Sequence, residues 1–393
     1  MTIQNFIGNF EAFPILARWD FFNHGGVAPL PAVAARAIEV FAKQASESTY
    51  IDTGWYQDVE LLRSSAAKLI GAHRDEIAFV KNTSEGIATV ANGIDWQRGD
   101  RIVTTNIEYP ANIYPWMDVA NRHGVELVLV EEQANADGSR SVPMDRFMAE
   151  VNHPKTRLVA LSHVEYASGQ RWDIATIGKA CRERGKLFCV DAIQTMGIIP
   201  IDVVAMNIDY LAADGHKWLL GPEGAGIFYC RKELLAKTRP VLIGWMNVIN
   251  AQNYGDYDFT LRNDAAKFEC GSWNIPGLLG LKASLELLAD LTTPLVSERI
   301  KTLTDYLIGK LSAAGFEIVS PRAGESWSGI VSFNLAHRKC HEAVVRHLRK
   351  EDRIEIALRE KRLRATPHFY NTEKQMDRLV ECLVDAQAKY VVG

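Results

Sequence analysis

Lys217 is the residue of this sequence with the clearest potential for covalent chemistry. It lies in the segment Asp214–Trp218, directly after an apolar run, and the turn-rich segment Gly221–Gly224 follows it. Open α/β sheets bind their ligands where parallel strands end, and a lysine amine at such a place can act as a nucleophile toward a carbonyl group. Because position alone favours an ordinary surface lysine, the neighbouring motifs decide its interpretation.

Asp191 ends another apolar run, Leu187–Val190, where an unpaired carboxylate would be costly to desolvate. A protonated pyridine nitrogen would be a suitable cationic partner, and the pair would keep such a ring an electron sink. Gln194, three residues later, could donate a hydrogen bond to a phenolic oxygen on the same ring. The alternative for Asp191 is a helix N-cap.

A third candidate element is a phosphate site at Lys81–Gly86, which follows an apolar run and opens an alanine-rich stretch. Backbone N–H groups at a helix N-terminus and the hydroxyls of Thr83 and Ser84 could converge on a phosphate there. Plain capping by either hydroxyl is the alternative.

The elements that must position these residues have the pattern of an α/β protein. Short, almost continuously apolar runs alternate with amphipathic stretches between residues 77 and 230, as expected for a mostly parallel sheet that is covered on both faces. We predict seven strands: Ile77–Lys81, Arg101–Thr105, Glu126–Glu131, Arg157–His163, Leu187–Asp191, Tyr210–Ala213 and Ala225–Cys230.

The C-terminal third has a different pattern, which predicts a smaller α+β domain. A helix is expected after Pro276, a second one ends at Gly315, and a last helix starts from a capping box of Thr372 and Gln375. The strands expected here are Phe316–Val319, Gly329–Asn334 and Ile354–Arg359. We therefore predict an N-terminal arm at 1–20, a large domain at 21–260 and a small domain at 261–393 that packs with the arm.

The composition excludes several classes of function. The 393 residues are 47% hydrophobic and 23% charged, with a formal net charge of −4 and no long basic run, so neither a nucleic-acid surface nor a polybasic membrane anchor is expected. Six scattered cysteines without a C-x-x-C pair suit reduced thiols in the cytoplasm and argue against a zinc site. We expect a small-molecule partner and no metal.

The motifs taken together resemble the class V aminotransferase family. The resemblance is carried by Ser162–Val164, Asp191–Gln194 and Gly215–Lys217, and it continues through Phe268–Ser272 and Leu363–Thr372. It implies the type I fold of enzymes that hold pyridoxal 5′-phosphate (PLP) as a Schiff base on a lysine and act at the α-carbon of an amino acid.

The same resemblance assigns roles to individual residues. Lys217 would form the Schiff base, Asp191 would pair with the pyridine nitrogen, and Tyr109 would stack on the ring, although a tyrosine there could also be ordinary core. The residues implied around the phosphate are Thr83, Ser84 and His216. Ser272 would reach the phosphate of the neighbouring subunit, which implies a homodimer with shared active sites.

Arginines complete the implied site. Arg364 resembles the clamp that the family uses for the substrate carboxylate, a role suited to a bidentate guanidinium, and Arg359 would assist it. For Arg362 a solvated strand face is the better interpretation.

The sequence departs from cysteine desulfurases of the family, which carry a catalytic cysteine on a loop between the two arginine-bearing strands. Only Glu360–Leu363 separates Arg359 from Arg364, and no cysteine is nearby in the sequence. Tyr109 replaces a histidine, Tyr166 an asparagine, and Asp214 a serine that commonly binds phosphate; we expect the Asp214 carboxylate to turn toward backbone instead.

The segment Phe22–Pro29, the pair Gly244–Trp245 and the short arginine loop look most like the isopenicillin-epimerase-like branch. We therefore expect a lyase or aminotransferase without a persulfide cysteine. The alternatives are a cysteine desulfurase or selenocysteine lyase, an amino-acid epimerase and, more distantly, a non-catalytic PLP-binding protein.

Overall fold

A seven-stranded sheet forms the centre of the computed structural model, which describes residues 2–136 and 139–391. Its strand order is β2-β10-β9-β8-β7-β3-β4, and β10 runs antiparallel to both of its neighbours whereas the other pairs are parallel. Its strands are β2 (Ile77–Val80), β3 (Arg101–Thr105), β4 (Glu126–Val130), β7 (Thr156–Ser162), β8 (Leu187–Asp191), β9 (Tyr210–Asp214) and β10 (Gly226–Cys230). All seven strands predicted from the sequence are present, which confirms the α/β fold.

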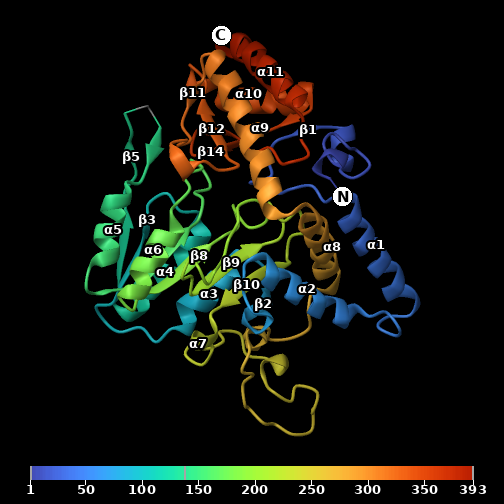
Figure 1. Cartoon of the computed structure of the whole chain (residues 1–393), viewed down its shortest axis with the longest axis vertical. Coiled ribbons are helices and arrows are strands. Elements are labelled where there is room, and N and C mark those ends of the chain that lie inside the picture. The colour runs from blue at the N-terminus through green and yellow to red at the C-terminus, as the bar shows by residue number, and fades with distance from the viewer. Residues whose placement is uncertain (1, 137–138, 392–393) are drawn as a thin grey trace.

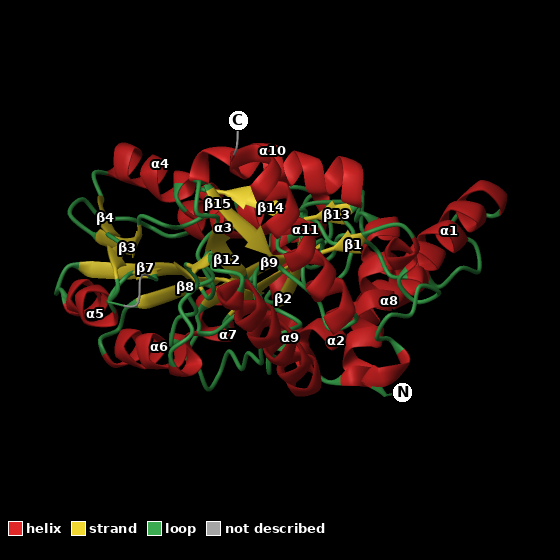
Figure 2. Ribbon diagram, turned by 90° about the horizontal axis from the view of Figure 1, so that it is seen from above, coloured by secondary structure: helices red, strands yellow, loops and turns green. Residues whose placement is uncertain are grey.

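Helices cover both faces of this sheet (Figures 1 and 2). Apolar residues of one face, such as Ala160 and Ala212, pack in one core with α3 (Thr83–Gly93) and α4 (Tyr114–His123). Alternate strand residues, such as Val159 and Leu211, pack in a second core on the other face. The helices of that second core are α2 (Trp55–Leu69), α5 (Met144–Asn152), α6 (Ile174–Glu183) and α8 (Ile275–Leu291).

A second, four-stranded antiparallel sheet lies in the C-terminal part, with the order β11-β12-β15-β14. Its strands are β11 (Glu317–Ile318), β12 (Val331–Asn334), β14 (Ala357–Arg359) and β15 (Arg362–Ala365), and it shares a third core with α9 (Thr293–Ala313), α10 (His341–His347) and α11 (Glu373–Val391). Thr372 Oγ1 accepts from the Gln375 backbone N–H and Gln375 Oε1 from the Thr372 N–H, so the predicted capping box is confirmed.

The single strand predicted at Ile354–Arg359 is wrong in one respect, because it is split into two short strands. Its first part, β13 (Ile354–Glu355), pairs in parallel with β1 (Asp20–Phe21), and only β14 joins the four-stranded sheet. A partner more than 300 residues away in the sequence therefore divides this run, and no local pattern signals it.

The N-terminal residues lie against the C-terminal part of the chain. The Phe13 ring stacks on Tyr370 at 3.8 Å between ring centroids, and the Gly8 N–H donates to the Tyr370 carbonyl. The remaining elements are α1 (Ala32–Glu47), α7 (Lys232–Leu235) and the small hairpin β5 (Gln133–Ala134) and β6 (Arg140–Ser141). None of the described helices combines the length and apolar character needed to cross a membrane.

Candidate functional site

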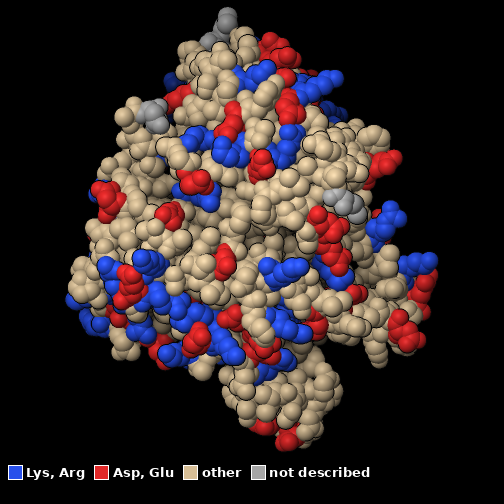
Figure 3. All heavy atoms as spheres, in the orientation of Figure 1, with Lys and Arg blue, Asp and Glu red and all other residues tan. Residues whose placement is uncertain are grey.

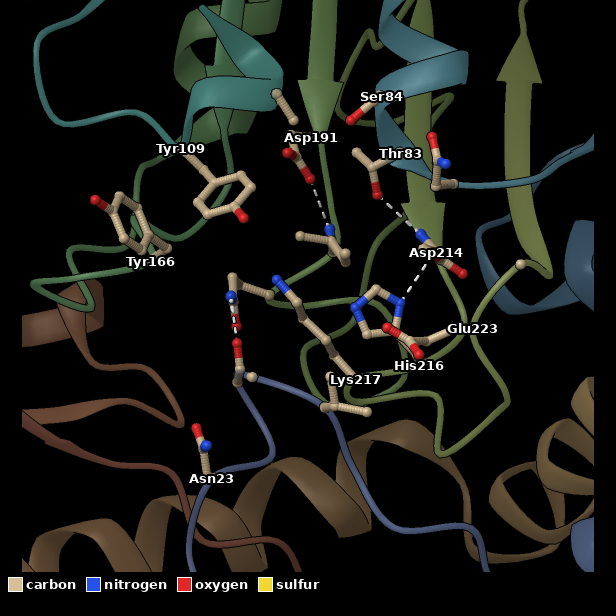
Figure 4. Close-up of a pocket in the computed structure, with 18 of the residues that line it drawn as sticks. Asn23, Thr83, Ser84, Tyr109, Tyr166, Asp191, Asp214, His216, Lys217 and Glu223 are labelled. Carbon is tan, nitrogen blue, oxygen red and sulfur yellow. Dashed lines mark hydrogen bonds and ion pairs between the residues drawn. The ribbon is translucent and has the colours of Figure 1, made fainter. Parts of the chain in front are cut away.

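A cavity of about 960 Å³ lies at the carboxyl ends of β8 and β9, between the segment 21–27 and the hairpin β14–β15 (Figure 4). It collects nearly all of the site residues predicted from the sequence. The predicted residues that line it are Thr83, Ser84, Tyr109, Asp191, Gln194, His216, Lys217, Arg359 and Arg364. They come from the carboxyl ends of β2, β3, β8 and β9 and from the hairpin β14–β15.

Lys217 projects into this cavity from the turn after β9, and it is only 9% exposed. Burial lowers the pKa of its amine to about 8; the Asp191 carboxylate opposes this shift, and the charges of Arg364 and Arg359 add to it. The amine also lies 5.5 Å from the centroid of the Tyr109 ring. A lysine that is partly neutral near pH 8 is a competent nucleophile and base.

Asp191 ends β8 at the wall of the cavity, where it is 3% exposed. Burial raises its pKa to about 6, while a hydrogen bond from the Ile193 N–H at 2.9 Å and the charge of Lys217 hold that pKa down. Within the described chain, no arginine or lysine forms an ion pair with this carboxylate, so it is available to a cationic group in the cavity.

The residues predicted to bind phosphate lie around the N-terminus of α3. Thr83 Oγ1 accepts a hydrogen bond from the Asp214 N–H at 3.0 Å and keeps its own proton free, and Ser84 is exposed to the cavity. His216 Nδ1 lies 2.9 Å from Asp214 Oδ2, while Asp214 Oδ1 accepts from the Gly215 N–H. The Asp214 carboxylate thus accepts from the backbone, as the sequence predicts, and it also lies against His216, which the sequence did not predict.

Two tyrosines stand beside this arrangement. Tyr109 and Tyr166 meet edge to face, with ring centroids 5.2 Å apart. The Tyr166 hydroxyl donates to Glu360 Oε1 at 2.7 Å, and burial raises the pKa of that hydroxyl above its usual range. Gln194 reaches the cavity wall, but its amide donates to the Gly25 carbonyl and accepts from the Trp218 indole.

Arg364 is a buried cation without an acidic partner. It is 1% exposed, its Nη1 donates to the Tyr166 carbonyl at 2.6 Å, its Nη2 donates to Asn23 at 3.3 Å, and its Nε has no partner in the described structure. Burial, helped by the charge of Arg359, lowers its pKa to about 9. Since a lone buried charge is costly, the site is suited to a carboxylate.

Two predicted residues lie elsewhere. Arg362 is not in the cavity, and its guanidinium pairs with Glu132 at 3.1 Å instead of facing solvent freely, so its predicted solvated position is only partly right. Ser272 is exposed and lines a separate hollow next to Cys270. Its predicted contact is with a neighbouring subunit, and a single chain does not test it.

The sequence interpretation missed two buried glutamates near Asp191. Glu108, after β3, accepts hydrogen bonds from the N–H and hydroxyl of Ser162, and Glu165, after β7, accepts from the Trp172 indole. Burial raises the pKa of Glu108 to about 8 and that of Glu165 well above its usual range. The sequence contains a signal for them, because Glu108 lies three residues and Glu165 two residues after a predicted apolar strand.

The family model for class V aminotransferases matches residues 26–379. A protein of Methanothermobacter thermautotrophicus described as a probable cysteine desulfurase is 30% identical over 393 residues, which cover 94% of this chain and 95% of that protein. The chain belongs to the class V aminotransferase family. The predicted resemblance is therefore confirmed.

Solved structures agree with this membership. The cystine C–S lyase C-DES, in complex with its product cysteine persulfide, superimposes with a TM-score of 0.85 at 28% identity, and the match covers 95% of this chain and 99% of that one. A C-DES mutant with glycine covalently linked to its PLP cofactor has a TM-score of 0.86 at 27% identity, covering 96% and 99%. This class V chain is accordingly a PLP-dependent enzyme of the type I fold.

The cavity fits PLP on its own chemistry. Lys217 supplies an amine, Asp191 an unpaired carboxylate for the ring nitrogen, and Thr83 and Ser84 supply free hydroxyl protons at the start of an 11-residue helix. His216 completes the polar end. We propose that these residues, with Tyr109 and Gln194 beside the ring, hold the cofactor.

The class V chain has no loop between its two arginine-bearing strands. Arg359 pairs directly with Arg362, so that β14 and β15 are joined by a two-residue turn, Glu360 and Lys361, in which both residues have positive φ. All six cysteines are free, and in the described part of the chain none of them lines the cavity. The missing cysteine loop predicted from the sequence is confirmed.

Proposed function

We propose that this enzyme is a lyase that eliminates a group from the β-carbon of an amino acid and releases it without transfer to a protein thiol. The two-residue turn at Glu360–Lys361 carries this proposal, because it leaves no loop on this hairpin that could carry a cysteine to the substrate. The description of one structural relative as a cystine C–S lyase supports the same chemistry.

Bound PLP supplies an electron sink that makes the α-proton of an amino acid acidic. Arg364 holds the substrate carboxylate through the guanidinium N–H protons that Tyr166 and Asn23 do not use. Lys217, with its pKa lowered to about 8, accepts the α-proton. Loss of the β-substituent with its bonding electrons, release of the amino group as Lys217 takes back its bond to the cofactor, and addition of water would then give a keto acid and ammonia.

The surroundings of Lys217 favour a single base. Tyr166 stays protonated because its pKa is raised, and its hydroxyl is held by Glu360. Glu355, the carboxylate on β13 that lines the cavity, is held by Arg349 at 2.6 Å. Epimerisation by two opposed bases is therefore less well supported than elimination.

We further propose a homodimer in the cytoplasm. The six free cysteines suit a reducing compartment. A protruding segment, residues 241–262, exposes Trp245, Tyr254, Tyr257 and Phe259, and Figure 3 shows few charges over this protrusion at the bottom of the molecule. An apolar surface of this kind is typical of a protein contact, and Ser272 lies close by in the sequence.

The reaction is tested by its products. The PLP-loaded enzyme is incubated with cysteine, cystine and β-chloroalanine, and keto acid, ammonia, alanine and protein persulfide are measured. We expect equal amounts of keto acid and ammonia, with a Cys270→Ser control behaving like the wild type. Alanine together with a persulfidated cysteine would instead show a desulfurase, and keto acid without ammonia would show transamination.

A further inference from the structure

Two guanidinium groups in the cavity lack an acidic partner. Arg364 has none within the described chain, and Arg359, half-buried on β14, donates only to the Leu358 carbonyl at 2.8 Å. The two are close enough for Arg359 to disfavour the charge of Arg364, and both disfavour the charge of Lys217. Like charges gathered in this way are expensive unless anions neutralise them.

The acidic side chains near Arg359 and Arg364 already have other hydrogen-bonding partners. Glu355 binds Arg349 through both of its oxygens, at 2.6 Å each, and Glu360 accepts from the Tyr166 hydroxyl. Asp191 lies at the opposite, ring-binding end. The α-carboxylate of an amino acid would neutralise one guanidinium and leave the other without a partner.

We infer that the substrate carries a second acidic group, which binds at Arg359 while Arg364 holds the α-carboxylate. The inference rests on the proposed function only in placing an amino acid in this cavity. The ligand class is an α-amino acid whose side chain ends in a carboxylate or sulfinate, or in the second carboxylate of a disulfide-linked amino acid.

Binding of succinate and glutarate, compared with their monoamides, tests this inference. These probes lack an amine and cannot react, and each pair differs only in one acidic group. Titration calorimetry on the PLP-loaded enzyme should show at least one dicarboxylate binding about tenfold or more tightly than its monoamide, as a charge-assisted hydrogen bond in a buried site would give.

Three variants make the result specific. Arg359→Gln should reduce the dicarboxylate preference to about onefold while leaving monoamide binding within a few-fold, and Arg359→Lys should keep part of the preference. Arg362→Gln, on the same hairpin but outside the cavity, is the matched control and should keep all of it. Cystine is then compared with cysteine by kcat/KM, and aspartate and cysteine sulfinate, whose side-chain acids do not leave with their bonding electrons, are compared as inhibitors; the acid whose advantage falls in Arg359→Gln identifies the source of the second acidic group.

Equal binding of dicarboxylates and monoamides by the wild type would overturn the inference. So would an equal loss of both in Arg359→Gln, because Arg359 would then share the α-carboxylate with Arg364. The proposed lyase fails on a different observation, the products formed, so the two failures are distinguishable.

Discussion

Lys217 and Asp191 illustrate how single residues become functional through burial. Desolvation lowers the pKa of Lys217 and raises the pKa of Asp191, so burial favours the neutral form of each side chain. The two groups carry opposite charges in a cavity that also contains arginines without an acidic partner in the described chain. We propose that in the PLP-loaded enzyme the ring nitrogen pairs with Asp191 and a covalent bond to the cofactor removes the charge of Lys217. The cost of burying them is thus recovered only when the cofactor is bound.

In enzyme freed of amino acids, replacement of Lys217 by alanine should remove the absorbance band of the lysine-bound cofactor and its fixation to the protein by borohydride, and lower activity by more than about a thousandfold, because the lysine acts as nucleophile and base. The fold should persist, as judged by circular dichroism and melting temperature. Lys179→Ala, an exposed lysine on α6, is the control and should keep the absorbance band. A cofactor that borohydride still fixes to the Lys217→Ala protein would assign the Schiff base to another lysine.

Asp191→Asn should change the pH dependence of stability in the cofactor-free protein. The carboxyl has a folded-state pKa of about 6, above the ordinary value of 3.8, so its protonated form is favoured by the fold and stability is lost as pH rises through this window. Asparagine removes that loss, which amounts to about 3 kcal/mol for a shift of about two units.

Calorimetric melting between pH 4 and pH 8 measures this effect. Asp191→Asn should melt at the wild-type temperature near pH 4 and above it at pH 8, whereas Asp118→Asn, an exposed carboxyl on α4, should show no such divergence. A lower melting temperature for Asp191→Asn at pH 8 would mean that the attraction between the Asp191 and Lys217 charges outweighs desolvation.

At the scale of elements, the sequence identified the parts of the fold that are buried on both faces. Strands such as Leu187–Asp191 are almost wholly apolar because helices cover both sides, so their composition alone marks them. The pairing of β1 with β13 was not predictable, because each is two residues long and the pairing depends on the closure of the whole chain.

The site was predictable to a similar extent. Asp191 and Lys217 follow predicted strands, so their meeting at one sheet edge follows from topology. The engagement of Gln194 with Gly25 and Trp218, and that of Tyr166 with Glu360, depend on segments brought together only by tertiary packing. Side-chain partners of that kind leave no pattern in the sequence.

The β14–β15 turn gives a prediction at this scale. Glu360 and Lys361 both have positive φ, as a type I′ hairpin turn requires, and this conformation strains any residue except glycine, asparagine or aspartate. Lys361→Gly should raise the free energy of unfolding by about 0.5 kcal/mol, and Lys361→Val should lower it by about 1 kcal/mol. Melting temperatures in the order glycine, lysine, valine check this, and the reverse order would contradict the strain.

At the scale of the whole molecule, we propose to keep the division into an arm at 1–20, a large domain at 21–260 and a small domain at 261–393. The arm packs on Tyr370, as this division expects. One element bridges the proposed boundary: α8 belongs by sequence to the small domain, yet it packs against α1 and α2 and shares the core of the large sheet. The cavity lies where the parts meet, as ligand sites commonly do.

Hybrid dimers test whether the proposed homodimer shares its active sites. A Lys217→Ala subunit has an intact Ser272, and a Ser272→Asp subunit has an intact Lys217 but would repel the phosphate of its partner. Each variant alone should be inactive or weakly active. After mixing and subunit exchange, half of the dimers are hybrids, and each hybrid contains one site with native Lys217 and native Ser272, so activity should recover to about a quarter of the wild-type value.

Sedimentation must show dimers in all samples. If Ser272 acted within its own chain, every site would retain one defect and mixing would restore nothing, and a monomeric, fully active wild type would remove the proposal altogether.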